Sequence, residues 1–475
     1  MDTRLASQKS NFCSLGLESL EDRVTPAKFL WNASLLTPKF WSTVSNWEKW
    51  SNNSNSYQYQ SVSTPSANDD VLFSGELESY NCVVDVSGGV TVKSVKVEVG
   101  YTSSIILSNP LFIVGGGLNM DSVGSAFRGS AVGVPAVHGN LKIINSGNSA
   151  PNSSGFTWRA GDLIDVTVTA DNSVISILGS SQRSMDGSAI VLQNSSRMYW
   201  NDGNIDVVNP SANSSIAIGM GCKFVIQSSG TWGMTDAPTV GTYFAVGNYG
   251  KVHVKSGANA TINGDYTTDN YTFVESGTIT VTKRAVQTYG IFELKSGGTV
   301  KVTTKPLNIA EGSLVGTGTV DGNCTLGYDP NLGVPVPPST TASISPGPSD
   351  STNPDRIGTL TITAQFQMLG GTMWIDINKY GVFDTVVVQG AYAALSDGRL
   401  EVSNGPEFTP DTGVYFYFVT GNSVAGFKAE NVNILNNYWI LEDLTPENPY
   451  ERFSGRYFRT KADTTGFGLE VFRLP

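Results

Sequence analysis

The chain is poor in charged residues, histidine and cysteine, and these shortages exclude several classes of site. Only 15% of its 475 residues are charged, against about 25% in an average soluble domain. Two histidines and widely separated cysteines do not provide the clustered ligands of a structural zinc site. We therefore expect no metal site and no disulfide framework, and we expect the cysteines to be small buried thiols. The cysteines are Cys13, Cys82, Cys222 and Cys324.

Positive charge and long apolar runs are also lacking. The 30 basic and 41 acidic residues give a net charge of −11 and a pI near 4.8, with no run of Lys or Arg. This balance argues against a nucleic-acid partner and against binding to an anionic membrane surface. No segment approaches the run of about 18 apolar residues that a transmembrane helix needs, so we expect no membrane insertion. The acidity favours solubility outside the cell.

Small and β-branched residues take the place of charge. The chain has 51 glycines and is rich in Val, Thr, Ser and Asn, while hydrophobic residues make up 40% of it. Such a composition favours short pleated strands joined by tight turns. Apolar residues recur throughout at strand spacing, so the low charge does not indicate disorder.

A repeat of 20 residues determines the predicted architecture. Ser-Gly pairs begin at Ser256, Ser276 and Ser296, and apolar residues keep the same register two positions before each serine. The aligned positions are Val254, Val274, Leu294 and Leu314, and then Ala260, Thr280, Val300 and Val320. Fixed periods of about 20 residues indicate a solenoid, and local alternation with period two indicates that strands build it. The glycine after each serine supplies a corner with positive φ.

We therefore predict an all-β fold, a right-handed parallel β-helix with an aromatic cap. Between Val83 and Leu326 we expect roughly ten to twelve coils of about 20 to 24 residues each. The predicted organisation is a leader at 1–27, a cap at 28–80, the β-helix at 81–326, a Pro/Gly/Ser-rich loop or linker at 327–357, and a β-rich continuation of the solenoid at 358–475.

Four tryptophans near the start of the solenoid are the basis for the predicted cap. Trp31, Trp41, Trp47 and Trp50 fall within twenty residues. A parallel stack exposes unpaired backbone groups on its first strand, and large aromatic side chains with polar flanks can cover that edge. The alternative is a carbohydrate-binding platform, on which exposed tryptophans stack against sugar rings.

The first residues carry a motif that predicts export. Residues 17–27 read L-E-S-L-E-D-R-V-T-P-A and closely resemble the L-E-x-L-E-D-R-x-x-P-[AS] leader of planctomycete secreted and surface proteins. The resemblance implies export, although residues 1–27 contain no apolar run of the kind found in an ordinary signal peptide. The alternative is a short exposed amphipathic helix with no targeting role.

Other segments resemble the β-helix region of autotransporter-type proteins. The tryptophans followed by P-S-A-N-D-D-V-L-F at 65–73 are similar to the W…NW…P-x-x-x-D-D-V-x-F opening of these proteins. Their closing pattern matches L-V-G-T-G-T-V-D-G-N at 314–323, S-P-G at 345–347, G-T-L-T-I at 358–362, F-D-T-V-V-V-Q-G at 383–390 and F-T-P-D-T-G at 408–413. The chain departs from this pattern at 395–400, and from 436 onward nothing matches. The resemblance implies a parallel β-helix and export, and it specifies no activity.

A search for catalytic motifs identifies no catalytic, cofactor-binding or metal residues. Asp69 and Asp70 form an adjacent acidic pair, but they lie in the capping motif. The N-T-D, G-H-G and R-I-K motifs of β-helical glycosidases are missing, and neither His138 nor His253 has a G-x-S-x-G partner. Six scattered acids on the solenoid are either solvated turn residues or members of a site assembled across coils. They are Asp162, Asp165, Asp171, Asp186, Asp202 and Asp206.

Three functions remain open from the sequence. We expect a non-enzymatic structural or adhesive protein, extracellular or at the cell surface, without a cofactor. Its expected partners are cell-envelope components or extracellular glycans. The alternatives are a polysaccharide-active lyase or hydrolase, which would cluster acids beside exposed aromatics, and a glycan-binding module, which would show an aromatic stripe without carboxylates. A polar surface of Ser, Thr and Asn would favour the structural protein.

Overall fold

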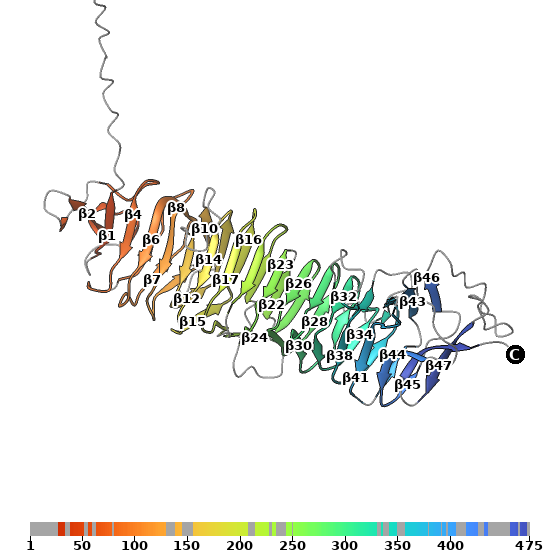
Figure 1. Cartoon of the computed structure of the whole chain (residues 1–475). Coiled ribbons are helices and arrows are strands. Elements are labelled where there is room, and N and C mark those ends of the chain that lie inside the picture. Colours follow the sequence, from red (N-terminus) through yellow and green to blue (C-terminus); the bar gives the residue numbers. More distant parts are fainter. Residues whose placement is uncertain are drawn as a thin grey trace, which may run out of the picture.

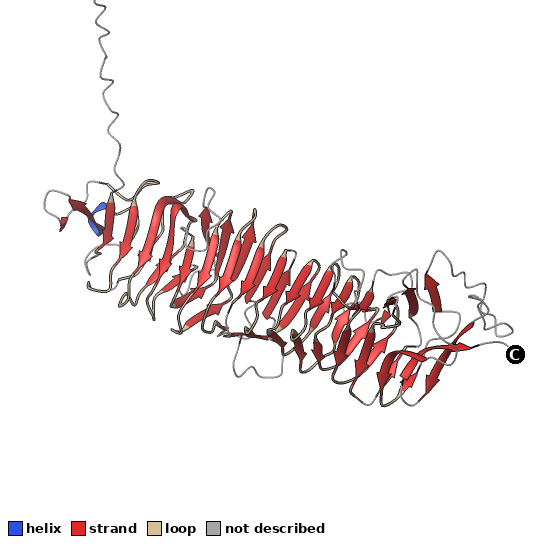
Figure 2. Cartoon of the chain, in the orientation of Figure 1, coloured by secondary structure: helices blue, strands red, loops and turns tan. Residues whose placement is uncertain are grey.

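The chain forms an elongated β-solenoid, and its strands stack one above another along the rod (Figures 1 and 2). The regular secondary structure of the computed structural model consists almost entirely of strands, and its short helical element η1 (Val44–Asn46) is a 3-10 turn. The prediction of an all-β parallel β-helix is therefore confirmed. The structure describes residues 27–33, 39–51, 56–58, 63–77, 80–129, 138–144, 155–207, 214–227, 230–233, 244–248, 250–329, 334–335, 342–348, 357–378, 380–390, 392–395, 398–404, 415–425, 432–435, 457–463 and 466–472.

Each coil contributes one strand to each of three ladders, which we number in the order in which the chain visits them. Ladders 1 and 3 belong to one hydrogen-bonded sheet, because β6 (Val90–Val97) and β8 (Leu111–Met120) run through both. Ladder 2 consists of two shorter sheets.

The strands of each ladder are parallel and in register, and each adds one rung to the rod. Ladder 1 comprises β1 (Lys28–Trp31), β4 (Asp70–Phe73), β6, β8, β11 (Phe156–Trp158), β14 (Val174–Ile177), β17 (Arg197–Trp200), β20 (Lys223–Ile226), β23 (Lys251–Val254), β26 (Tyr271–Val274), β29 (Ile291–Leu294), β32 (Ser313–Gly316), β37 (Ser343–Pro346), β40 (Thr372–Ile377), β43 (Arg399–Asn404) and β46 (Val432–Leu435). Ladder 2 comprises β5 (Cys82–Val83), β7 (Ser104–Ile106), β9 (Ala126–Arg128), β12 (Gly161–Ile164), β15 (Arg183–Asp186) and β18 (Asp206–Val207), then β21 (Gly230–Gly233), β24 (Asn259–Asn263), β27 (Thr278–Val281), β30 (Thr299–Val302), β33 (Thr319–Asp321), β38 (Thr359–Ile362), β41 (Thr385–Val388) and β44 (Tyr415–Gly421). Ladder 3 comprises β6, β8, β10 (Gly139–Ile144), β13 (Val166–Asp171), β16 (Ala189–Gln193), β19 (Ser214–Ile218), β22 (Phe244–Asn248), β25 (Asp265–Thr268), β28 (Ala285–Gln287), β31 (Leu307–Ile309), β34 (Cys324–Leu326), β39 (Phe366–Met368), β42 (Ala393–Ala394) and β45 (Val424–Ala425).

The hydrophobic core is continuous along the inside of the rod, because alternate side chains of every ladder point inward. One buried cluster extends from Phe29 to Phe467. The strand β23 shows the alternation that produces it: Val252 and Val254 are buried, whereas Lys251 faces solvent. Period-two alternation predicted this arrangement in the repeat, and the structure confirms it.

The 20-residue register is confirmed for its central coils. The pairs Val254–Val274 and Val274–Leu294 lie opposite each other in ladder 1, and all three side chains are buried. The Ser276 hydroxyl donates a hydrogen bond to the Ser256 hydroxyl one rung away, at 2.6 Å. These two serines therefore stack as the repeat predicts.

Two positions in the predicted register are wrong. Leu314 was predicted to lie opposite Leu294, but it lies opposite Phe292, and Leu294 lies opposite Gly316. This coil is two residues longer than the 20-residue repeat. Ala260 lies opposite Ile279, not Thr280, because the turn after Val274 is one residue shorter than the turn after Val254. Turn length changes from coil to coil while the strands remain paired.

The N-terminal end of the stack is closed by antiparallel strands and aromatic side chains. Strand β1 is the first rung of ladder 1; β2 (Trp47–Ser51) pairs antiparallel with it, and β3 (Ser56–Gln58) pairs antiparallel with β2. Trp31, Trp41 and Trp47 are buried, and the ring of Trp47 lies 4.9 Å from that of Trp31 and 4.7 Å from that of Trp41. These three tryptophans belong to the core and are covered, so they cannot form a sugar-binding platform.

The C-terminal end is closed in a similar way. Strand β44 continues ladder 2 in parallel with β41, and its other edge pairs antiparallel with β48 (Gly466–Phe472). Strand β47 (Tyr457–Asp463) then pairs antiparallel with β48. The solenoid therefore continues beyond residue 358 as predicted, and antiparallel strands are added at both ends of the rod.

The segment predicted as a loop or linker at 327–357 contains a rung of the solenoid. Strand β37 lies between β32 and β40 in ladder 1, and its Ile344 is buried in the core. A short antiparallel pair, β35 (Tyr328–Asp329) and β36 (Val334–Pro335), precedes it. The many prolines in this segment argued against a strand and concealed this rung. The strand accommodates Pro346 as its last residue.

Candidate functional site

A groove with a partly polar lining lies on the outer surface of ladder 1. Its volume is about 470 Å³, and it crosses β6, β8, β11 and β14. Glycines line the bottom of the groove, where there is no room for a side chain. A Cβ at Gly117 or Gly155 would clash with a neighbouring carbonyl oxygen. The outward row Lys96, Asn119, Thr157 and Ser176 supplies its polar groups, since these residues lie opposite one another on successive rungs.

The charged groups at this groove are paired within the chain. Arg159 Nη1 donates to Asp121 Oδ1 at 2.8 Å and to Asn119 Oδ1 at 3.1 Å. Lys96 Nζ lies 2.8 Å from Glu98 Oε1. The groove therefore offers amide, hydroxyl and guanidinium groups, which suit hydrogen bonding to a polar ligand.

Two of the six candidate acids lie in one row of ladder 2. Asp162 lies opposite Ser184, and Ser184 lies opposite Asp206. Two rungs, about 9.6 Å of backbone, separate the aspartates, at the upper limit of the separation used by paired glycosidase carboxylates, and Ser184 lies between them. The Ser184 hydroxyl donates to Asp162 Oδ1 at 2.6 Å, and burial raises the pKa of Asp206 while Arg183 opposes the rise.

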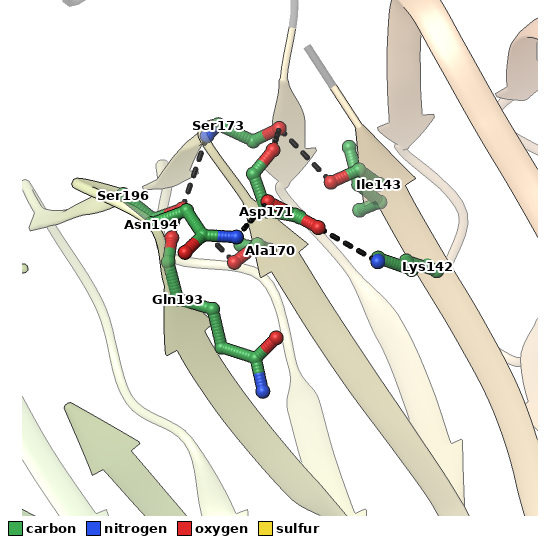
Figure 3. Close-up of polar contacts among 8 residues, drawn as sticks. All are labelled: Lys142, Ile143, Ala170, Asp171, Ser173, Gln193, Asn194 and Ser196. Atoms are coloured by element: carbon green, nitrogen blue, oxygen red, sulfur yellow. Dashed lines mark hydrogen bonds and ion pairs between the residues drawn. The ribbon is translucent and has the colours of Figure 1, made fainter. Parts of the chain in front are cut away.

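Asp171 links three coils at the corner between ladders 3 and 1 (Figure 3). It forms an ion pair with Lys142 at 2.7 Å and accepts a hydrogen bond from Asn194 Nδ2 at 2.7 Å. The hydrogen bond from Lys142, followed by that from Asn194, lowers the pKa of Asp171. Its role in the described structure is to hold coils together.

The same corner carries buried serines that bridge rungs. The Ser196 hydroxyl donates to the carbonyls of Ala170 and Gln193 and accepts from the backbone N–H of Ser173 (Figure 3). The Ser173 hydroxyl donates to the carbonyl of Ile143 at 2.9 Å. Hydroxyl groups thus satisfy backbone polar groups that the turn leaves unpaired.

The remaining three acids lie apart from these groups. Asp165 is exposed and has a φ of 51°, as a turn residue does. Asp202 is exposed and accepts from the N–H of Gly203 at 2.8 Å. Asp186 is half-buried at the end of β15, where it pairs with Ile164. The structure therefore distributes the six acids over turns and strand rows, as solvated turn residues and coil-bridging groups.

Arg183 is a buried residue that sequence reasoning missed. Its side chain is 0% exposed and donates only to backbone carbonyls, those of Arg159, Leu178, Gly179, Asp202 and Asn204. Burial lowers the pKa of Arg183, and Asp202 and Asp206 oppose that shift. One side chain thus connects the turns of three coils through hydrogen bonds. No local sequence motif predicts that role.

The other candidates have structural partners. Asp69 accepts hydrogen bonds from the N–H groups of Ala27 and Ser66, and Asp70 lies 3.6 Å from Lys93. His138 Nε2 lies 2.7 Å from Thr167 Oγ1. His253 lies 3.4 Å from Glu275 Oε1, and burial together with Lys255 lowers its pKa against the effect of Glu275.

The expected buried thiols are present. Cys82, Cys222 and Cys324 are buried free cysteines, whereas Cys13 lies outside the described residues. Burial raises the pKa of Cys324 to about 12. Within the described ranges, no group of three or more His, Cys, Asp or Glu could hold a metal ion. The described ranges likewise contain no helix long and apolar enough to cross a membrane.

One outward row of ladder 2 consists of small polar side chains. Thr278, Thr299, Thr319 and Thr361 lie opposite one another on successive rungs of β27, β30, β33 and β38. Asn259 extends the row on β24. All face outward, since Ile279, Val300 and their equivalents between them are buried.

No protein-family model matches this chain, and no curated protein matches it significantly.

Proposed function

We propose that the chain is a non-enzymatic structural or adhesive β-solenoid that acts outside the cell. A continuous core closed by antiparallel strands at both ends is the observation that carries this proposal. Such a body acts as a stiff spacer, because each coil packs on its two neighbours. Antiparallel strands cover the first rung of ladder 1 and the last rung of ladder 2. The Thr and Asn rows of ladder 2 agree with the polar outer surface expected of a structural protein.

Export is tested by protease accessibility on intact cells. A tagged chain carrying residues 1–27 is expressed in a planctomycete host beside a variant whose residues 17–27 are scrambled. We expect external protease to digest the parent on intact cells and the scrambled variant only after lysis. Equal protection of both chains would overturn the extracellular part of the proposal.

The non-enzymatic part is tested with sugar polymers. Pectin, polygalacturonate and alginate are incubated with the protein, with and without Ca²⁺, while reducing ends and unsaturated products are followed. We expect no turnover above a buffer control, because Ser184 lies between Asp162 and Asp206 and donates a hydrogen bond to Asp162. Turnover that disappears in D162N, D165N, D202N or D206N would establish an enzyme instead.

A further inference from the structure

A row of three cations runs along the outer surface of ladder 1. Arg197, Lys223 and Lys251 are the first residues of β17, β20 and β23, and they lie opposite one another on successive rungs. Lys223 and Lys251 are exposed, and the residue after each cation is buried, so the row faces outward. We call these three residues the cationic row.

This row is unfavourable for the isolated chain. Adjacent rungs are about 4.8 Å apart, and like charges directly opposite each other in a sheet repel. Among the described residues, no carboxylate forms an ion pair with Lys223 or Lys251. In a protein with a net charge of −11, Lys223 and Lys251 therefore concentrate positive charge that a bound anion would neutralise.

Aromatic rings border one end of the row. Tyr271 follows Lys251 on the next rung, with the Lys251 ammonium 5.6 Å from the centre of its ring. The rings of Tyr271 and Phe273 are stacked, with an interplanar angle of 10°, and His253 packs on Phe273 at 4.7 Å. Lys251 lies over the Tyr271 ring, and His253 and Lys295 lie against Phe273, so the half-buried rings offer apolar edges to a sugar ring.

The groove described above continues the row at its other end. Val174 and Ser176 line the groove, and they lie opposite Arg197 and Tyr199 respectively. A single track therefore follows ladder 1 from Lys96 to Tyr271, first hollow and polar, then positively charged, then aromatic. It crosses the rungs β6, β8, β11, β14, β17, β20, β23 and β26.

The spacing of the charges selects the class of ligand. The cationic row offers one positive charge per rung, or about one per 4.8 Å. Duplex DNA carries one negative charge per about 1.7 Å, a density that the row does not match. A polysaccharide with one carboxylate on each sugar carries its charges much further apart than duplex DNA does, and its apolar ring faces can contact the edges of Tyr271 and Phe273.

We propose that this track binds a linear acidic polysaccharide of the uronate type, laid along the rod with its carboxylates on Arg197, Lys223 and Lys251. The neutral part of the polymer lies in the groove beside Asn119, Thr157 and Ser176. The inference names the partner of the adhesive function proposed above and rests on that function for its biological setting. The binding test described next does not depend on that adhesive function.

The test measures binding of the purified full chain to polygalacturonate, to its methyl ester and to single-stranded poly(A), at low and high salt. We expect binding to polygalacturonate that weakens with salt, and binding at least tenfold weaker to the uncharged methyl ester, because charge is the main recognition element. Equal binding to the methyl ester, or tighter binding to poly(A), would overturn the proposal.

Matched triple variants locate the site. The variant R197Q/K223Q/K251Q is expected to lose at least tenfold in affinity for polygalacturonate and to lose the salt dependence. The control K283Q/K301Q/K305Q changes the net charge equally but lies on and beside ladder 2, and it is expected to bind as the parent does. Thermal melting verifies the fold of both. Equal losses in the two variants would show nonspecific attraction and refute the track.

A third variant, Y271A, separates the aromatic contact from the contribution of charge. We expect it to weaken polygalacturonate binding severalfold while the salt dependence is kept, and an unchanged affinity would remove the aromatic end from the track. Failure of these binding tests leaves the surface location tested by protease unaffected. Loss of surface location would in turn leave the binding result standing.

Discussion

Two aspartates in this solenoid have environments that shift their pKa in opposite directions. Asp171 is held in its charged form by Lys142 and Asn194 at a corner of the coil. Asp384 is 0% exposed, and burial raises its pKa to about 8, although the N–H groups of Gly358 and Asp376 donate to its oxygens at 2.7 and 2.9 Å. The pH dependence of stability distinguishes the two.

For Asp171, we expect stability to be lost on acidification. A pKa lowered by folding stabilises the protein above the unfolded value, and the contribution disappears as pH falls through the folded value. The variant D171N keeps the shape and removes the charge. We expect it to unfold more easily than the parent by about 1 kcal/mol at pH 7, with the difference shrinking at pH 3, as measured by urea unfolding. A difference that stays constant between these pH values would contradict the assignment.

For Asp384, the sign is reversed. A folded pKa near 8, above the ordinary value of 3.8, stabilises the protein fully only at low pH, and the contribution is lost as pH rises toward 8. The stability of the parent relative to D384N is therefore expected to fall between pH 5 and pH 9, by at most about 1.4 kcal/mol per pH unit. A relative stability that stays constant over this range would show that the two N–H donors hold an ionised carboxylate.

At the scale of the element, we predict that the N-terminal cap protects the stack from aggregation. Deleting residues 28–75 removes β1 to β4 and leaves the backbone of Ser94–Val97 in β6 as an open parallel edge next to the core. We expect this variant to aggregate, measured by light scattering and size-exclusion chromatography. Deletion of residues 1–26, which keeps the cap, is the control. A monomer as heat-resistant as the parent would show that the tryptophans serve another purpose.

The sequence predicts strands far better than it predicts turns. Period-two alternation and the Ser-Gly repeat located the core positions Val254 and Val274 because every coil buries the same face. The repeat failed at Leu314 and Thr280, since turns absorb insertions of one or two residues without disturbing the ladder. Gly257 and Gly297 have the predicted positive φ of 76° and 81°. Gly277 does not, and it is glycine because a Cβ would lie 2.4 Å from the Lys255 carbonyl oxygen.

The alignment of outward-facing side chains into rows could not be predicted from the sequence, for a different reason. Arg197, Lys223 and Lys251 are separated along the chain by unequal intervals, so their alignment depends on turn lengths that no local pattern reveals. Arg183 likewise meets its carbonyl partners only across coils. The acids were visible in the sequence, but which of them share a row, such as Asp162 and Asp206, follows from the register alone.

At the scale of the whole molecule, the rod should tolerate the loss of a complete coil. Deleting residues 256–275 joins Lys255 to Ser276 and lets Val254 take the place of Val274 opposite Leu294. We expect a folded, monomeric rod whose melting temperature is within a few degrees of the parent, because neighbouring coils present equivalent surfaces. Deleting residues 266–275, half a coil, should instead unfold or aggregate the chain. Equal behaviour of the two deletions would contradict the one-dimensional stacking of coils.

The parallel ladders also determine how this rod responds to tension. Backbone hydrogen bonds between coils run nearly along its axis, so a pull on the two ends loads the coils in series and the weakest interface opens first. Each coil of 20 residues that peels away exchanges one rung of about 4.8 Å for about 70 Å of extended chain. A tether built in this way lengthens in discrete steps and dissipates energy at each one, so the remaining coils and anything bound along them are spared the full force.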